Sequence, residues 1–424
     1  MNTDYCGLDF GTSNSTIGLI ADGSPALLPV EGRHTTLPSA IFFSFEDNQT
    51  YFGRQAIAEY IDGAQGRLMR SLKSVLGTSL IHEKTRIKAA SMEFSDILGL
   101  IIARLKACAD TAAAANITRT VLGRPVHFVD GDAAADAQAQ NELEKAARKQ
   151  GFKHIEFQFE PIAAALDYEQ QVRSEKLALI ADIGGGTSDF SIVRVSPQRA
   201  KANDRRADIL ANCGVHIGGT DLDRMLSMAR VMPQLGYRTA NRNGKQELPT
   251  GYFFDLATWH FINQLYKPKV MLELNEVRRE AVERARVERL IALVQKRKGH
   301  ALASKVEAAK ILLTSQECAT IGLELDEHGF EVEATRIDFE AAIAKAAERI
   351  RETVQQSLAM ASITASDIQA VFLTGGSSQI PLIRRMILQD LPGADVVDGD
   401  AFGSVGLGLT LEAQRKFGRV KAGV

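Results

Sequence analysis

The chain has 424 residues, of which 45% are hydrophobic and 24% are charged, and its formal net charge at pH 7 is -2. This is ordinary globular composition with room for two sizeable domains, and the small negative charge argues against nucleic acid as the main partner. No stretch approaches the ~18 apolar residues that span a bilayer, and the start lacks a basic segment followed by an apolar run. We therefore expect a cytoplasmic protein with no membrane contact.

The first half predicts a sheet interrupted by a mainly helical insert. Strand patterns occupy residues 5–10, 15–20, 26–30 and 40–45. Helical spacing of apolar residues follows at 57–76 and 94–115. The sheet then resumes with a strand at 119–122, a helix at 132–150, a strand at 155–159 and a helix at 161–168. This strand–helix alternation predicts the α/β class.

The second half restarts with an apolar strand at 177–182. A polar loop at 196–207 carries several basic residues, and we interpret it as a solvated hairpin tip. A charged helix at 269–298 is interpreted as a surface helix of a second insert, with a coiled-coil partner site as the alternative. A helix at 339–361 and a strand at 368–373 follow.

The cysteines stand singly and far apart, at Cys6, Cys108, Cys213 and Cys318. This spacing indicates neither a disulfide framework nor a zinc site. We expect all of them to be small buried hydrophobic side chains.

One short turn motif occurs twice, first in residues 9–14 (DFGTSN) and again in residues 182–189 (DIGGGTSD). Each lies between two apolar strand-like runs. Small residues allow positive φ and leave backbone N–H groups uncovered, which suits a phosphate group. Two facing turns would hold a polyphosphate, and Asp9 and Asp182 would hold a divalent cation through water.

A third glycine cluster, at residues 374–378 (TGGSS), follows a buried strand and opens a helix. Its glycines would let the backbone lie against a nucleoside, with the helix N-terminus facing the phosphates. Neither a G-x-x-x-x-G-K-[ST] loop nor an intact G-x-G-x-x-G motif that opens a helix is present. The sequence therefore predicts a nucleotide site of another kind.

Five segments carry a family resemblance: GLDFGTSNSTIG, EPIAAALDY, ADIGGGTSDFSIV, FLTGGSSQIPLIRRM and DAFGSVGLGL. In sequence and order they resemble the nucleotide-site segments of the DnaK-type heat-shock chaperones, within the actin and sugar-kinase superfamily. The resemblance covers residues 4–414 and is greatest to the short, YegD-like members that lack a peptide-binding domain. It implies an actin-like ATPase fold with a nucleotide cleft between two lobes. Lobe I would comprise 1–173 with 396–424 and an insert at about 44–117, and lobe II would comprise 174–395 with an insert at about 220–334.

The resemblance also implies site roles for individual residues. Asp9 and Asp182 would hold Mg²⁺ through water, Glu160 and Asp189 would arrange the metal and water near the γ-phosphate, and Lys73 would steer the attacking water. The catalytic set is Lys73, Glu160, Asp182, Thr187 and Asp189. The nucleotide-binding set is Gly11, Thr12, Ser13, Asn14, Gly184, Gly185, Gly186, Thr187, Gly219, Glu307, Lys310, Ile311, Gly375, Gly376, Ser377, Gln379 and Asp400. Hydrolysis would be in-line attack by water on the γ-phosphate.

Three departures from the family pattern affect these expectations. Ile311 and Gln379 stand where the family normally places arginines on the adenine, so weaker nucleotide binding is expected. The stretch at 130–135 (DGDAAA) lacks the basic residue that relays nucleotide state between domains. Fewer than ten residues follow the predicted helix at 410–417, so this sequence is not expected to hold extended apolar peptides.

The sequence thus predicts an ATP-binding, slowly ATP-hydrolysing, DnaK-like chaperone made of the nucleotide-binding part, with ATP or ADP and Mg²⁺ as ligands. Client or co-chaperone proteins are the other expected partners. Three alternatives share the fold. A small-molecule kinase would need a carboxylate base and a substrate pocket, a filament-forming protein would need self-association surfaces, and a nucleotide-gated regulator would bind without turnover.

Overall fold

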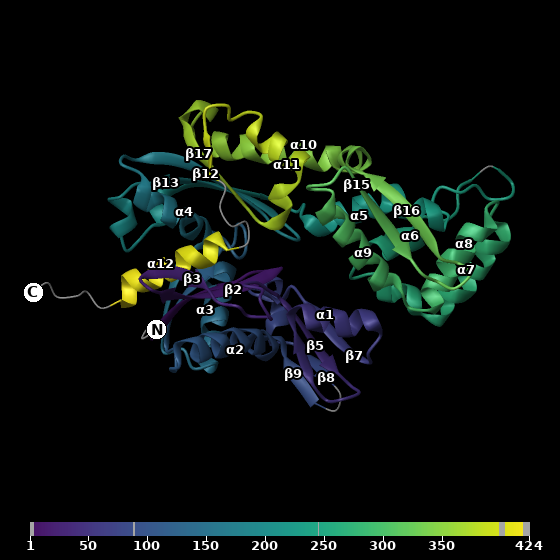
Figure 1. The fold of residues 1–424 in the computed structure, drawn as a ribbon, viewed down its shortest axis with the longest axis horizontal. Coiled ribbons are helices and arrows are strands. Elements are labelled where there is room, and N and C mark those ends of the chain that lie inside the picture. Colours follow the sequence, from purple (N-terminus) through teal and green to yellow (C-terminus); the bar gives the residue numbers. More distant parts are fainter. Residues whose placement is uncertain (1–3, 88–89, 245, 398–402, 419–424) are drawn as a thin grey trace, which may run out of the picture.

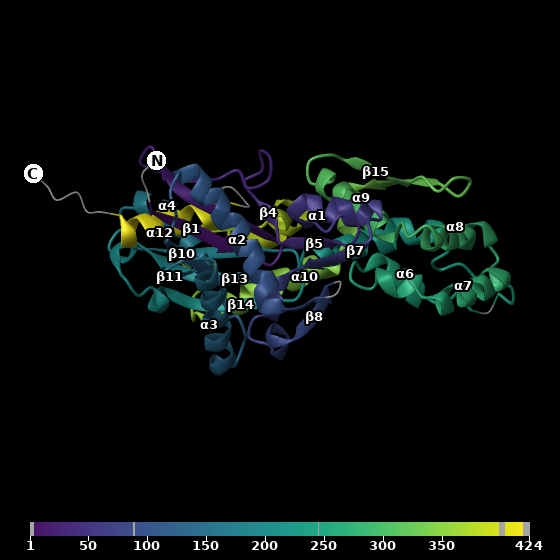
Figure 2. The same cartoon turned by 90° about the horizontal axis from the view of Figure 1, so that it is seen from below.

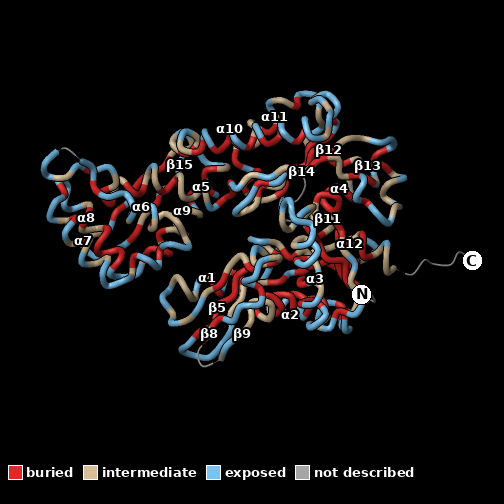
Figure 3. Tube along the Cα trace, turned by 180° about the vertical axis from the view of Figure 1, so that it is seen from behind, coloured by how far each residue is buried: buried red, intermediate tan, exposed pale blue. Residues whose placement is uncertain are grey.

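The computed structural model describes residues 4–87, 90–244, 246–397 and 403–418. Two sheets lie in two lobes, and each lobe carries an outer insert (Figure 1). The last helix, α12 (Ser404–Phe417), lies on the lobe that contains the N-terminal strands. Buried residues concentrate along the strands of both sheets and the helices on them (Figure 3). Among the described residues, no helix combines the length and apolar character needed to cross a bilayer.

The sheet of lobe I has the order β11-β10-β1-β2-β3, with β4 beside β2. β1 and β2 form an antiparallel hairpin, and β10 and β11 run parallel to β1. Because side chains alternate along β1, Leu8 faces α2 and α3, whereas Tyr5 faces α4 and α12. The bounds are β1 Tyr5–Phe10, β2 Asn14–Ala21, β3 Ser24–Leu27, β4 Leu37–Pro38, α2 Phe94–Ala113, β10 Arg119–Arg124, α3 Ala133–Lys149, β11 His154–Phe159 and α4 Glu160–Gln171.

The sheet of lobe II has the order β14-β13-β12-β17-β18. Its hairpin β12–β13 repeats β1–β2 in register, because Ile183 pairs with Ser188 as Phe10 pairs with Ser15, and four residues lie between each pair. The turn that is repeated in the sequence is therefore repeated in the structure. The bounds are β12 Lys176–Ile183, β13 Ser188–Val195, β14 Ile209–Val215, α10 Arg336–Met360, β17 Ile368–Thr374, α11 Pro381–Leu388 and β18 Asp395–Val397.

The insert of lobe I is a mixed α/β unit around the small sheet β6-β5-β7. Its elements are β5 Ala40–Ser44, β6 Thr50–Phe52, α1 Gly53–Asp62, β7 Gly66–Arg70, the 3-10 turns η1 Leu72–Val75 and η2 Ser79–His82, β8 Lys84–Ile87 and β9 Ala90–Glu93. Of the two helices expected in this insert, the one at 94–115 is confirmed as α2 (Phe94–Ala113), and the one at 57–76 is wrong. Gly63 ends α1 at φ 94°, and β7 pairs with β5, so the predicted helix at 57–76 is a helix, a strand and a turn.

The insert of lobe II is mainly helical and extends away from the rest of lobe II (Figure 2). Its elements are α5 Gly219–Leu226, the π-helical η5 Ser227–Val231, η6 Met232–Leu235, α6 Gly251–Ala257, η7 Ile262–Tyr266, α7 Pro268–Glu280, α8 Arg284–Gln295, α9 Gly299–Leu312, β15 Cys318–Leu323 and β16 Phe330–Thr335. The single helix predicted at 269–298 is wrong. Ala281 leaves the helix with ψ 138° because it pairs with Asn241 across the insert.

Two smaller expectations are also corrected. The loop at 196–207 is not a solvated tip throughout, because Arg205 is buried and makes two hydrogen bonds to Glu169, at 2.8 and 2.9 Å, and an ion pair with Asp208. Of the cysteines, only Cys6 is buried, and Cys318 is exposed at the start of β15.

Helix α4 lies between the two sheets. Its Ile162 and Ala165 pack against the lobe II strands, and its Ala163 packs against lobe I. Helix α12 packs closely here through glycines. A Cβ atom on Gly408 would lie 1.9 Å from the Ala163 carbonyl oxygen, and one on Gly7 would lie 2.2 Å from the Thr410 nitrogen. α4 is thus held on both sides, which fixes the residues at its N-terminus.

Candidate nucleotide site

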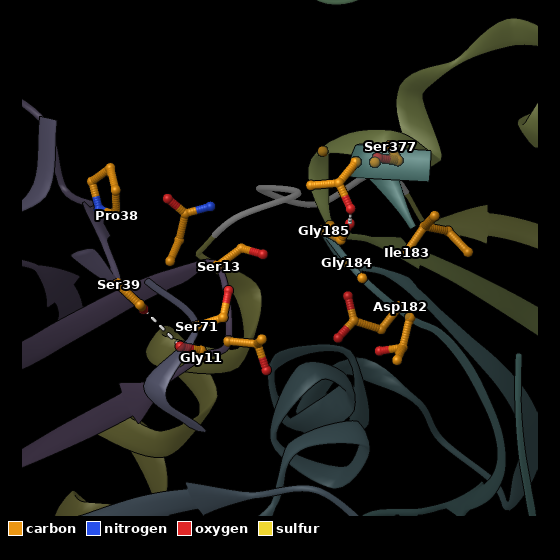
Figure 4. Close-up of a pocket in the computed structure, with 18 of the residues that line it drawn as sticks. Gly11, Ser13, Pro38, Ser39, Ser71, Asp182, Ile183, Gly184, Gly185 and Ser377 are labelled. Carbon is orange, nitrogen blue, oxygen red and sulfur yellow. Dashed lines mark hydrogen bonds between the residues drawn. The ribbon is translucent and has the colours of Figure 1, made fainter. Parts of the chain in front are cut away.

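The two repeated turns face each other across the cleft between the lobes (Figure 4). They approach so closely that a Cβ atom on Gly185 would lie 2.2 Å from Ser13 Oγ. The first turn is fixed by Ser39, whose hydroxyl donates to the Gly11 carbonyl at 2.6 Å. The second is closed on itself by Gly184 N–H, which donates to the Thr187 carbonyl at 2.9 Å. Ser39 was not predicted from the sequence, because nothing around a lone serine indicates a contact with a residue far away in the chain.

The third glycine cluster adjoins the second turn. β17 runs parallel to β12, with Asp182 opposite Thr374, and Gly375 follows at φ 76°. A Cβ atom on Gly375 would lie 2.3 Å from the Ile183 carbonyl oxygen, so only glycine fits. Gly376 and Ser377 lie in the 3-10 turn η9 (Gly376–Gln379), and Gly219 N–H donates to the Gly184 carbonyl at 2.9 Å. The structure therefore brings together the predicted glycines of three segments.

Lys73 and Glu160 form an ion pair in the cleft, with 2.6 Å between Nζ and Oε1. Lys73 lies on the turn η1, not on a helix, and this turn is set by Ser71 at φ 57°. Glu160 opens α4 beside Pro161 at the first turn. The Lys73 and Glu160 side chains are only 9% and 17% exposed. Burial lowers the pKa of Lys73, but the attraction of Glu160, Asp9 and Asp182 outweighs it and holds the pKa above its ordinary value.

Three aspartates surround this pair. Burial, together with Glu160 and Asp182, raises the pKa of Asp9 to about 7 against the opposing effect of Lys73. Burial, with Asp189 and Glu160, raises the pKa of Asp182 to about 6. Burial also raises the pKa of Asp189, which accepts a hydrogen bond from Thr187 Oγ1 at 2.9 Å. With four carboxyl groups around one lysine, the site is short of positive charge.

The cleft has no complete set of direct metal ligands. Within the described ranges, no group of three or more His, Cys, Asp or Glu side chains could hold a metal ion. Asp9 and Asp182 are nevertheless suited to Mg²⁺, which keeps several waters and takes only one or two carboxylates alongside phosphate oxygens. A cation beside the two carboxyls would favour their ionised forms, and so oppose the burial and the neighbouring carboxyl groups that raise the pKa of each.

On α9, Lys310 and Ile311 have different surroundings. Lys310 is buried, donates to the Gly219 carbonyl at 3.1 Å and lies 2.9 Å from Asp223. Burial raises the pKa of Asp223 to about 6, with Lys310 opposing and Glu307 assisting the shift. Ile311 is 58% exposed, and Gln379 is exposed as well. Asp223 was not predicted from the sequence, although its place in the segment GGTDLD, just after two glycines, could have indicated it.

The cleft has a volume of about 1760 Å³ and is lined by all the predicted site residues that the structure describes. Asp400 lies outside the described residues. In the stretch at 130–135, which differs from the family pattern, the Asp132 side chain accepts hydrogen bonds from the N–H groups of Ala134 and Ala135 and caps α3. The stretch at 130–135 therefore provides the N-terminal cap of α3.

Two lobes with matching hairpins, each carrying a carboxylate toward a shared cleft, define an actin-like nucleotide-binding fold. The family model described as Hsp70 protein matches residues 5–232 and 275–399, and the chain belongs to the Hsp70 family, whose ATPase domain is actin-like.

Curated relatives agree with this family. The chaperone protein DnaK of Mycoplasmopsis agalactiae is 27% identical over an alignment of 392 positions, which covers 90% of this chain and 53% of the relative. The chaperone protein dnaK1 of Synechocystis sp. is 26% identical over an alignment of 438 positions, which covers 96% of this chain and 53% of the relative. The chain spans about half the length of these relatives.

Proposed function

We propose that this chain binds ATP with Mg²⁺ and hydrolyses it slowly to ADP and phosphate, as the nucleotide-binding unit of an Hsp70-type chaperone. The observation that supports this most directly is the buried Lys73–Glu160 pair between the two facing turns. A lysine held by a carboxylate beside two N–H-rich turns is suited to phosphoryl transfer to water, in which position and charge do most of the work.

In this proposal the turns at 11–14 and 184–187 bind the phosphates through backbone N–H groups. Lys73 orients the attacking water and offsets the charge that develops on the γ-phosphate. Glu160 holds Lys73 at 2.6 Å and accepts a hydrogen bond from the water. Thr187 and Asp189 complete the polar wall on the lobe II side.

Asp9 and Asp182 are the residues that would hold Mg²⁺. When bound, the cation would neutralise phosphate charge and polarise the γ-phosphate. Their buried carboxyls make the cleft negative without it, so we propose that metal and nucleotide enter together.

At the base end, we propose that Glu307 and Lys310 contact the ribose, and that Ile311 and Gln379 replace stacking arginines with weaker contacts. We further propose the lobe division at 173/174 and 395/396. Because the relatives are named chaperones, we propose client or co-chaperone proteins as partners, met in the cytoplasm.

Calorimetry with ATP, ADP and GTP, with and without Mg²⁺, tests the site, the metal and the base preference together. Phosphate release is then measured on the same protein. Binding without phosphate release would leave the nucleotide-gated regulator, and transfer of phosphate to an added small molecule would favour a kinase. Absence of adenine nucleotide binding would refute the proposal.

A further inference from the structure

Arg124 is a buried cation at the end of β10, and the mechanism proposed above gives it no role. Its side chain belongs to a residue that is only 7% exposed. The preceding residue, Gly123, lies so close to the site that an added Cβ atom would be 3.4 Å from both Asp9 Oδ1 and Glu160 Cγ. In the β10–β11 ladder, Arg124 pairs with Phe159, the residue before Glu160. A buried arginine therefore lies in the layer directly behind Glu160.

The Arg124 guanidinium joins the loop after β10 to the helix α3. Nε donates to the Pro125 carbonyl at 3.0 Å, and Nη2 donates to the Val126 carbonyl at 3.1 Å. On the α3 side, Nη2 donates to Asp136 at 2.7 Å and Nη1 donates to Gln140. Holding these acceptors together requires a planar group with donors on three nitrogens, which a lysine does not have.

Two aromatic rings pack on the same guanidinium, whose carbon lies 5.2 Å from the ring centroids of Phe128 and Phe159. Burial raises the pKa of Asp136, but hydrogen bonds from Arg124 and from the Phe128 N–H group outweigh it and hold the pKa below its ordinary value. The ion pair is therefore intact at neutral pH. Because Phe159 immediately precedes α4, packing of its ring fixes the direction in which this helix begins.

The same helix α3 also holds the turn that carries Lys73. Lys73 lies in η1, four residues before Gly77. The Gly77 N–H group donates to Glu142 on α3 at 3.2 Å. A Cβ atom on Gly77 would lie 3.1 Å from the Ala135 carbonyl oxygen, so the chain packs closely on the start of α3. α3 is thus joined to both partners of the buried ion pair, to one through Gly77 and to the other through Arg124.

We infer that Arg124 is a positioning residue for ATP hydrolysis. It holds Phe159 and the cleft wall at 125–128 against α3, and so fixes Glu160 at 2.6 Å from Lys73. The inference rests on the proposed function. A misplacement of about 1 Å at a reacting centre can cost about 10²-fold in rate. The phosphate turns have their own hydrogen bonds, so loss of Arg124 should slow hydrolysis about ten- to hundredfold while nucleotide affinity stays within about threefold.

The test measures single-turnover phosphate release, ATP and ADP affinity by calorimetry, and thermal unfolding on the full chain. The first variant is Arg124→Met. A second, Arg124→Met with Asp136→Asn, removes the carboxylate that the first leaves unpaired, while the amide oxygen can still accept from Phe128. Arg205→Met is the matched control, because Arg205 is 3% exposed and donates to Glu169 in the second half of the same helix α4.

Arg124→Met should release phosphate about ten- to hundredfold more slowly at unchanged affinity, whereas Arg205→Met should lose stability and keep the wild-type rate. In a Glu160→Gln background, Arg124→Met should slow release no further, because its effect on the rate passes through Glu160. If Arg124→Met unfolds, the double variant with Asp136→Asn decides. If that variant unfolds as well, Phe159→Leu decides, because it keeps every hydrogen bond of Arg124. Slow release is expected in each.

Several results would overturn the inference. They are a wild-type rate in a folded Arg124 variant, a loss of affinity as large as the loss of rate, the same slowing in Arg205→Met, or additive effects with Glu160→Gln. A wild type that binds ATP without releasing phosphate would also remove the role given to Arg124. Absence of nucleotide binding in wild type would refute the proposed function itself.

Discussion

Replacing Lys73 by alanine is the sharpest perturbation of the proposed site, because stability and turnover should respond to it differently. The lysine is the partner of Glu160 at 2.6 Å, and Asp9 and Asp182 also act on it. Removing one partner of a buried ion pair costs about 3 to 5 kcal/mol. The two side chains are 9% and 17% exposed in an open cleft, so we expect the lower end, about 3 kcal/mol, in the nucleotide-free protein.

The rate of ATP hydrolysis should fall by more than the loss of folded protein would explain. Removing one preorganised group that acts on the transition state typically lowers kcat by about 10² to 10³-fold. Because Lys73 is proposed to act mainly on the transition state, ATP affinity should change little. Single-turnover phosphate release, thermal unfolding and calorimetry measure the three quantities separately.

The double variant Lys73→Ala with Glu160→Gln separates the contribution of Lys73 to stability from its contribution to turnover. Without the orphaned carboxylate it should recover most of the lost stability, whereas turnover should stay low. Lys84→Ala is the control, because Lys84 lies on the same insert in an exposed pair 3.9 Å from Glu93. Turnover within about threefold of wild type in folded Lys73→Ala would refute the role given to Lys73.

Three further predictions concern the turns, the base and pH. Gly186→Ala should leave the melting temperature unchanged, since no atom lies within 4 Å of the added Cβ. The same variant should bind ATP more weakly in calorimetry, and an unchanged affinity would mean that the phosphates lie elsewhere. Gln379→Arg with Ile311→Arg should tighten ATP and ADP by about 1 to 2 kcal/mol through stacking, and no gain would mean that the adenine lies differently. Burial lowers the pKa of His300 to about 4, with the Trp259 carbonyl raising it and Arg70 lowering it. As pH falls below about 6.5, the imidazole therefore takes up a proton in the unfolded chain before it does so in the folded protein. The free energy of unfolding consequently decreases down to about pH 4. From pH 7 to 5, wild type should lose about 2 kcal/mol more than His300→Gln in urea unfolding, and equal losses would contradict a buried neutral imidazole.

The sequence predicted the parts of the site that depend on short-range chemistry. The repeated turns carry their glycines and aspartates within a few residues, and their identical register follows from the same spacing. The helix at 57–76 failed because the strand pairing of β7 with β5 overrides an apolar spacing that also suits a helix. Lys73 and Glu160 were assigned to one site only through the family resemblance, since 87 residues separate them, and their ion pair was not predicted. Ser39 gave no signal, because its hydrogen bond to Gly11 exists only once distant segments have packed.

The position of α12 has a consequence for the order in which the chain matures. Tyr5, Ile20 and Val121 form an apolar face of the first sheet that is covered by Leu409 and Ala413 of α12. During synthesis, the N-terminal strands emerge first, and the helix that covers them emerges only after all of lobe II. Lobe II and the preceding helix α4 can bury their shared apolar residues from a continuous stretch of chain, whereas the face of the lobe I sheet that packs on α12 lacks this cover until α12 has been synthesised. A nascent chain halted before residue 404 should therefore protect lobe II from protease while lobe I remains susceptible to cleavage.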